Sequence, residues 1–177
     1  ICLLFGPSAA GGAYIPAFCD IVVMVEGRAS MYLGSPRMAE MVIGENTTLE
    51  DMGGARMHCE VSGCGDVLVR SDEEAIDFAR RYLRYFPDHC DTHSEGFPPT
   101  DPAKAIEDLG RIIPTNQNMP FDMFELIERL VDASSFLEIK ALFAKELITG
   151  LARIGGRIIG IVASQPKVKG GVLFVDS

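Results

Sequence analysis

The sequence predicts an α/β protein, and three patterns along the chain support this prediction. Residues 1–5 (ICLLF) and 21–26 (IVVMVE) are continuous apolar runs of the kind found in buried strands. Between them, a glycine turn leads into a short helix over about 11–19. Residues 71–86 carry apolar side chains at helical spacing. Strands and helices are therefore mixed throughout, as in the α/β class.

The other elements of the first half are predicted from short local signals. Residues 31–33 (MYL) form a short strand that ends at Gly34-Ser35-Pro36, and a helix follows over 37–43. Thr48 with Asp51 is a capping-box pattern, which predicts a short helix through Met57.

The pair Ser71 and Glu74 predicts the start of the helix over 71–86 in the same way. Its core-facing side is expected to hold Ala75, Ala79, Tyr82, Leu83 and Phe86.

The second half begins with a change in composition. Residues 87–120 are polar and rich in proline, which is typical of a linker, so a boundary between two units is expected within about 88–118. After it, residues 121–132 read as a helix and 136–140 as a strand. Residues 144–163 read as a hairpin that turns at Gly155-Gly156.

Composition excludes several classes of protein. Of the 177 residues, 47% are apolar and 23% are charged, enough for a folded domain with a core. The net charge of −9 argues against nucleic-acid partners and anionic lipid surfaces. No apolar run approaches the roughly 18 residues that a membrane helix needs. The 5 cysteines contain no CxxC pair, which favours free thiols in a reducing compartment.

The glycine turn at residues 6–14 (GPSAAGGAY) is the strongest local signal for function. A strand that enters a helix through such a turn directs unpaired N–H groups at one point. The turn lacks the GxGxxG, GK[ST] and Gly-x-Ser-x-Gly patterns of dinucleotide sites, P-loops and nucleophile elbows. Two interpretations remain open: backbone donors for an oxyanion, or glycines that allow close helix packing.

Four segments in order are similar to the carboxyltransferase β subunit of biotin-dependent acyl-CoA carboxylases of the propionyl-, acetyl- and methylcrotonyl-CoA type. They are GPSAAGGAYIPAFCDIVVMVEGRASMYLGSP, LEDMGGARMHCEVSGCGD, FDMFELIERLVDASSFLEI and LARIGGRIIGIVASQP. The resemblance implies a crotonase-like fold. It also implies that the chain is an excised middle, with the end of a first carboxyltransferase domain (1–90), a linker (91–118) and the start of a second (119–177).

The resemblance further implies a reaction and its partners. A carboxyl group passes from carboxybiotin, held on a partner carrier domain, to the α (or vinylogous γ) carbon of a short acyl-CoA through an enolate. The expected partners are acyl-CoA, a biotin carboxylase or biotin carrier subunit, and further copies in a homo-hexamer. The expected location is the cytoplasm, or the mitochondrial matrix in a eukaryote. A biotin-dependent decarboxylase, or a non-catalytic fragment, remains an alternative.

The resemblance assigns site residues at three places. The N–H groups of Ala10, Gly11 and Gly12 would hold the thioester oxygen; some members carry their glycine pair one place earlier, at Ala10-Gly11. The acyl pocket would be lined by residues that follow the 31–33 strand or lie within the predicted 48–57 helix: Gly34, Ser35, Pro36, Gly53 and Gly54. Gly-Ser-Pro is equally a turn that starts a helix. No carboxylate follows in GSPR, which disfavours a hydratase.

Three other groups are weighed as sites and set aside. His58 matches a histidine of the family motif but is expected to be a structural hydrogen-bond partner rather than a general base. Residues 89–93 (HCDTH) contain metal-ligand types, but they lack a second cluster at zinc spacing and are expected to form a solvated loop, so no metal is expected. Ser8 paired with His58 as a hydrolase nucleophile is disfavoured because the elbow pattern fails.

Overall fold

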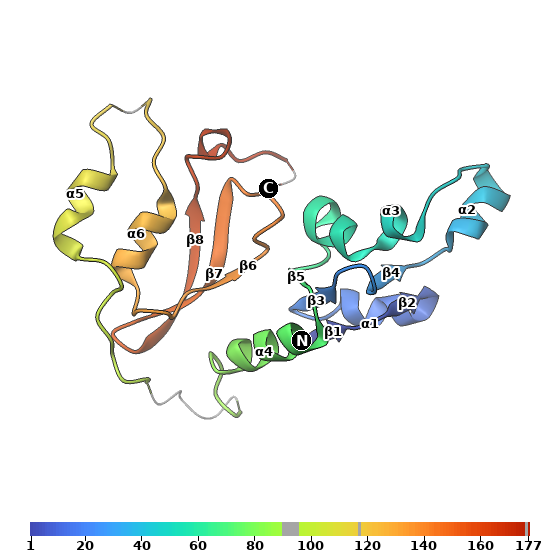
Figure 1. Ribbon diagram of the computed structural model, residues 1–177, viewed down its shortest axis with the longest axis horizontal. Helices are drawn as coiled ribbons and strands as arrows, with labels where there is room; N and C mark the ends of the chain where they lie inside the picture. Colours follow the sequence, from blue (N-terminus) through green and yellow to red (C-terminus); the bar gives the residue numbers. More distant parts are fainter. Residues whose placement is uncertain (90–95, 117, 176) are drawn as a thin grey trace. The chain divides into compact units, whose positions relative to one another are not determined.

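The computed structural model describes residues 1–89, 96–116, 118–175 and 177. The chain folds into two compact units, unit 1 (Ile1–Arg81) and unit 2 (Tyr82–Ser177), whose elements are labelled in Figure 1. The prediction of an α/β protein is confirmed, because parallel strands joined by helices build unit 1 and a helix on an antiparallel sheet builds unit 2. Among the described residues, no helix is long and apolar enough to cross a membrane.

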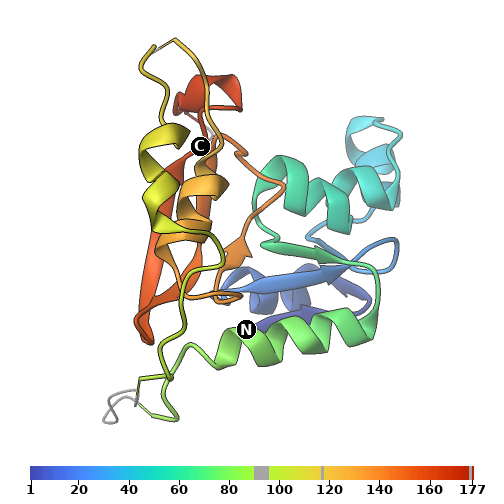
Figure 2. The same cartoon turned by 60° about the vertical axis from the view of Figure 1, so that its left-hand side comes forward.

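The core of unit 1 is a three-stranded parallel sheet in the order β1-β3-β5. Its strands are β1 (Cys2–Leu4), β3 (Val22–Val25) and β5 (Val67–Val69). Every residue of β3 is at most 2% exposed, which confirms the buried strand predicted from the β-branched run 21–26. The helix α4 (Asp72–Leu83) runs alongside these strands (Figure 2).

A second, two-stranded sheet carries the glycine turn. It pairs β2 (Pro7–Ala9) with β4 (Ser30–Tyr32) in parallel, with Ala9 opposite Tyr32. The β2 strand lies within the segment that the sequence indicated only as a turn. Since a three-residue strand has no periodicity of its own, its pairing with β4 defines it.

Unit 1 contains six helical segments among the described residues, and the two N-caps predicted from the sequence form. They are the 3-10 helix η1 (Ala10–Ala13), α1 (Tyr14–Ala17), α2 (Pro36–Ile43), α3 (Leu49–Gly53), the π-helix η2 (Met57–Ser62) and α4. Thr48 Oγ1 accepts from the Asp51 N–H at 3.1 Å and Ser71 Oγ from the Glu74 N–H at 3.2 Å, so both capping interactions form. The helix predicted through Met57 is instead α3 followed by η2.

The buried side of α4 differs from the predicted one. Ala75 and Ala79 are buried as expected, and Phe78 joins them. Leu83 and Phe86 remain 55% and 46% exposed, because the helix ends at Leu83 and the stripe that faces the sheet lies further towards its N-terminus.

Unit 2 is a three-stranded antiparallel sheet in the order β6-β7-β8 with α6 packed against it. The predicted hairpin is β7 (Leu147–Ile154) and β8 (Arg157–Ser164), and β6 (Leu137–Ile139) pairs with β7. Gly155 and Gly156 form the turn with φ of +57° and +77°, a conformation that other residues rarely adopt.

The buried core of unit 2 joins α6 (Met123–Leu130) to the sheet through Ile127, Val131, Ile148 and Ala152. Its remaining short helices are η3 (Ile106–Asp108), α5 (Leu109–Ile112) and η4 (Lys169–Gly171).

The segment that follows the 90–95 gap is bound to unit 2 despite its polar, proline-rich composition. The Phe97 N–H donates to the Gly156 carbonyl at 3.0 Å, and the Arg153 guanidinium lies 4.5 Å from the centre of the Phe97 ring. The Ala133 N–H donates to the Asp101 carbonyl at 3.2 Å. The assignment of 91–118 to a linker between two domains stays a prediction, but residues 97–101 are held by the hairpin tip and its surroundings.

Candidate functional site

In the glycine turn of unit 1, the residue with a strained backbone conformation is an alanine rather than a glycine. The chain leaves β2 at Ala9 in extended conformation and enters η1 at Ala10, whose φ is +50°. A left-handed conformation costs an L-residue about 1–2 kcal/mol, and glycine almost nothing. Gly11 and Gly12 have no such φ, so backbone strain does not explain these two glycines.

Packing does not explain Gly11 either. A Cβ atom built on Gly11 meets nothing within 4 Å, whereas one built on Gly12 lies 3.4 Å from Ser8 Oγ, an ordinary contact. Ala9, Ala10 and Gly11 are exposed. Within unit 1, the close-packing interpretation of the glycine pair is therefore unsupported, and the space in front of Gly11 is open.

Helix geometry separates the three candidate N–H donors. In a 3-10 helix each N–H reaches the carbonyl three residues earlier, so within η1 the Gly12 N–H is the first with an acceptor, at Ala9. The N–H of Ala10 lies at the end of the β2–β4 ladder, where Ala9 pairs with Tyr32. The N–H of Gly11 lies beyond that ladder and before the first helical bond. Gly11 is thus the strongest candidate for a donor to a ligand.

An apolar cavity of about 680 Å³ opens beside this turn. Three residues that follow the turn, Ala13, Tyr14 and Ala17, form one wall. The others come from β4, the turn after it, α2, α3 and η2: Met31, Tyr32, Leu33, Gly34, Ser35, Met38, Ala39, Val42, Ile43, Met52, His58 and Cys64. The cavity could thus accommodate an apolar group, and the last residue of η1, Ala13, lies in its wall.

Of the predicted pocket residues, Gly34 and Ser35 line the cavity. Ser35 is also the N-cap of α2, because its Oγ accepts from the Met38 N–H at 3.3 Å, and Pro36 is the first residue of that helix. Ser35 therefore caps α2 and also lines the cavity, while its role in an acyl pocket stays a prediction. Pro36 does not line the cavity, so its observed place is in helix initiation.

The pair Gly53-Gly54 lies behind the cavity rather than in its wall. A Cβ on Gly53 would collide with the Met31 carbonyl oxygen and lie 3.0 Å from Tyr32 Cβ, so Gly53 lets α3 approach β4 closely. A Cβ on Gly54 would meet only the end of the flexible Glu50 side chain. Gly53 therefore supports the strand that carries Met31 and Tyr32, and these two side chains line the cavity.

His58 lines the cavity with both ring nitrogens engaged. Nε2 lies 2.7 Å from the Met31 carbonyl oxygen and Nδ1 lies 2.8 Å from Ser62 Oγ. Since a carbonyl only accepts, Nε2 carries the proton, and in the neutral ring Nδ1 accepts from the Ser62 hydroxyl. His58 thus ties η2 to β4, as expected for a structural histidine.

The apolar wall formed by α2 was missed by the sequence interpretation. Met38 and Val42 are four residues apart and lie on the same side of α2, next to Ala39 and Ile43. The i, i+4 spacing of apolar residues in 37–43 was the available signal.

No cluster of three or more potential metal ligands is found among the described residues. Of the 89–93 group, Cys90, Asp91 and His93 lie outside the described residues.

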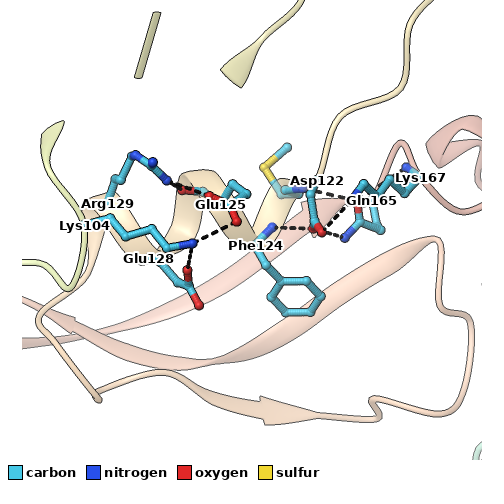
Figure 3. Close-up of polar contacts among 9 residues, drawn as sticks. Lys104, Asp122, Phe124, Glu125, Glu128, Arg129, Gln165 and Lys167 are labelled. Carbon is cyan, nitrogen blue, oxygen red and sulfur yellow. Dashed lines mark hydrogen bonds and ion pairs between the residues drawn. The ribbon is translucent and has the colours of Figure 1, made fainter. Parts of the chain in front are cut away.

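The polar cluster of unit 2 holds α6 in place (Figure 3). Lys104 Nζ lies 2.8 Å from Glu125 Oε1 and 2.6 Å from Glu128 Oε2. The hydrogen bond from Lys104 lowers the pKa of Glu125. At the other end, the Asp122 carboxylate caps the helix and accepts from Gln165 Nε2 at 2.9 Å. These contacts fix the helix to its surroundings.

The fold and the cavity define a crotonase-like α/β protein in which a glycine turn follows a buried strand and borders an apolar pocket. The family model described as "Carboxyl transferase domain" matches residues 1–177, so the chain belongs to the carboxyl transferase family. The predicted membership among acyl-CoA carboxylase β subunits and the crotonase-like fold are both confirmed.

Two relatives and one solved structure illustrate the match. The chain is 68% identical over 177 residues to "Uncharacterized carboxylase YngE" of Bacillus subtilis (strain 168), covering 100% of this chain and 35% of that protein. It is 36% identical over 185 residues to the "Biotin-dependent acetyl-/propionyl-coenzyme A carboxylase beta5 subunit" of Mycobacterium tuberculosis (strain CDC 1551 / Oshkosh), covering 100% and 34%.

The hexameric transcarboxylase 12S core, solved with hydrolysed methylmalonyl-coenzyme A bound, superposes with a TM-score of 0.91 at 32% identity. The match covers 98% of this chain and 34% of that one. The chain therefore spans about a third of the length of the relatives that it matches.

Proposed function

We propose that the protein is the carboxyltransferase component of a biotin-dependent acyl-CoA carboxylase. It would transfer a carboxyl group from carboxybiotin to the α, or vinylogous γ, carbon of a short acyl-CoA through an enolate. The observation that carries the proposal is the open space in front of Gly11, in the first turn of a helix whose last residue, Ala13, lines an apolar cavity. The family match over residues 1–177 supplies the reaction class.

The proposed role of the turn is to stabilise negative charge. When a proton leaves the carbon next to a thioester, charge develops on the thioester oxygen, and fixed N–H donors lower the barrier. Gly11 would provide the main donor from this unit, with Ala10 and Gly12 beside it. The cavity formed by α1, α2 and β4 would hold the acyl group, with Gly34 and Ser35 in its wall.

The cavity fits a reaction whose base comes with the carboxyl donor. None of its described lining residues is an aspartate or glutamate, and His58 has both ring nitrogens engaged in structural contacts. Biotin on a partner carrier domain would supply the carboxyl group and accept the proton. The residues of this chain would bind the acyl group, orient the thioester and exclude water.

The proposal includes partners and a location. A biotin carboxylase or biotin carrier subunit would deliver carboxybiotin, and further copies would assemble into a hexamer such as that described for transcarboxylase 12S. The exposed apolar residues of α2, such as Met41 at 77% and Val42 at 76%, are consistent with further protein surface covering unit 1. We place the protein in the cytoplasm.

The test is a steady-state carboxyl-transfer assay of Gly11→Val in the full-length protein. Valine fills the open space in front of the turn, so the rate should fall by a factor on the order of 10² to 10³. Because the Cβ at Gly11 meets nothing, thermal melts should be unchanged. Gly110→Val in α5 of unit 2 is the matched control, since a Cβ there also meets nothing within 4 Å.

The assay is run with acetyl-, propionyl- and methylcrotonyl-CoA and in the direction of decarboxylation, because a decarboxylase would use the same turn and cavity. Wild-type turnover by Gly11→Val would refute the role of the turn. A much lower melting temperature would instead show that Gly11 is needed for packing in the full protein.

A further inference from the structure

Two thiols of unit 1 lie at one edge of its parallel sheet. Cys2 begins β1, its Cα pairs with Val22 of β3, and its N–H donates to the Ile21 carbonyl at 2.8 Å. Cys19 precedes Ile21 by two residues, in the turn that leads from α1 into β3. The β1–α1–β3 connection therefore returns Cys19 to the strand end where Cys2 lies.

The side chains of these two cysteines interact. Cys19 Sγ donates to the Ile15 carbonyl of α1 at 3.3 Å. The two thiols are near enough for Cys19 to act electrostatically on Cys2. Both cysteines are free and only partly buried, so a small oxidant can reach them. Burial, and then the charge of Cys19, raise the pKa of Cys2.

We propose that Cys2 and Cys19 are a redox pair that forms a reversible disulfide when the protein meets a hydroperoxide. The thiolate of one of the two cysteines attacks an oxygen of the hydroperoxide and breaks the O–O bond, which gives a sulfenic acid on that cysteine. The departing oxygen takes a proton from solvent and leaves as an alcohol, or as water from hydrogen peroxide itself. The sulfur of the other cysteine then attacks the sulfenic sulfur, the S–S bond forms, and the sulfenic oxygen leaves as water with the proton of the attacking thiol. Two thiols lose two electrons, and the peroxide gains them.

The disulfide would act on the candidate site through the loop that it closes. Residues 3–18 contain the whole glycine turn and the cavity-lining residues Ala13, Tyr14 and Ala17. A covalent link between β1 and the end of α1 removes open conformations of this loop. Oxidation would therefore restrict the segment that carries the turn without changing any residue in it.

The other described cysteines provide controls. Cys59 is buried, and Cys64 is exposed at the cavity and bonded locally to Ser62. The structure assigns neither to the pair. Cys64→Ser is thus the matched control, because it removes a more exposed thiol from the same unit.

The test treats the full-length protein with hydrogen peroxide, alkylates the remaining thiols and maps peptides by mass spectrometry. We expect a peptide pair joined through Cys2 and Cys19 that dithiothreitol separates. Hydrogen exchange of residues 10–17 should slow about tenfold on oxidation. Cys2→Ser and Cys19→Ser should each lose the link and the slowing, while Cys64→Ser keeps both.

Three results would overturn the proposal: both thiols unmodified under excess peroxide, one of them converted to sulfinic acid while the other stays a thiol, or either thiol joined to Cys59 or Cys64. Exchange of the reduced variants is measured first. If the hydrogen-exchange pattern of a serine variant in its reduced form differs from that of the reduced wild type, the corresponding alanine variant replaces it. Loss of the disulfide is then measured only in folded protein.

Discussion

Gly53→Ala should destabilise unit 1, and the size of the effect follows from two opposing terms. The added Cβ would collide with the Met31 carbonyl oxygen and lie 3.0 Å from Tyr32 Cβ, both in β4. Both neighbours belong to a strand held in two sheet contacts, so they cannot rotate away. Overpacking of a rigid site costs about 3 kcal/mol, and replacing glycine by alanine in α3 returns about 1 kcal/mol. The net loss is about 2 kcal/mol.

The assay is chemical denaturation of Gly53→Ala in parallel with Gly11→Ala, both in the full-length protein. Gly11→Ala is the matched control because its Cβ meets nothing within 4 Å and its φ is not left-handed. The midpoint should fall for Gly53→Ala and stay within error for Gly11→Ala. Equal midpoints for the two variants and the wild type would refute the view that Gly53 serves packing while Gly11 serves the site.

Three further changes separate strain, hydrogen bonding and burial. Ala10→Gly should raise the free energy of unfolding by about 0.5–1 kcal/mol, because it relieves the left-handed conformation of an alanine and the entropy cost of glycine offsets only part of this gain. An unchanged or lower free energy of unfolding would contradict the strain at this residue. His58→Gln should lower that free energy by about 1 kcal/mol through the lost bond to the Met31 carbonyl, and a rate loss as large as that of Gly11→Val would contradict a structural role. Burial raises the pKa of Glu138, so the folded protein favours the protonated carboxyl group. The protein therefore loses stability as the pH rises from below the ordinary glutamate pKa through the raised pKa of the folded state. Glu138→Gln should therefore stabilise the protein at pH 7 more than at pH 4, and an equal effect at both would refute the burial effect.

Local sequence signals predicted the elements that depend on neighbouring residues. The β-branched run 21–26 is buried, Thr48 and Ser71 cap their helices, and Gly155-Gly156 turns the hairpin. In each case the signal lies within a few residues of the structure that it determines.

Features that depend on distant residues could not be predicted in this way. The β2 strand exists through its pairing with β4, and Phe97 is held by Arg153 and Gly156 of the hairpin. Polar, proline-rich composition describes how the 97–101 segment behaves alone, and says nothing of partners more than fifty residues away. The wall formed by α2 was missed for a related reason: one helical turn of apolar residues indicates burial but not what it faces.

The two glycine pairs of unit 1 show why residue type alone could not assign the site. Gly53 is a glycine because a backbone lies against it, whereas Gly11 faces open space. The strained position of the first turn is occupied by Ala10, although a glycine would adopt that φ without cost. The turn thus keeps a strained alanine beside an unstrained glycine. If only backbone freedom mattered, glycine would be needed at position 10 and dispensable at position 11. The opposite arrangement agrees with the proposed site, in which a ligand approaches the N–H of residue 11 closely and the residue before it stays fixed.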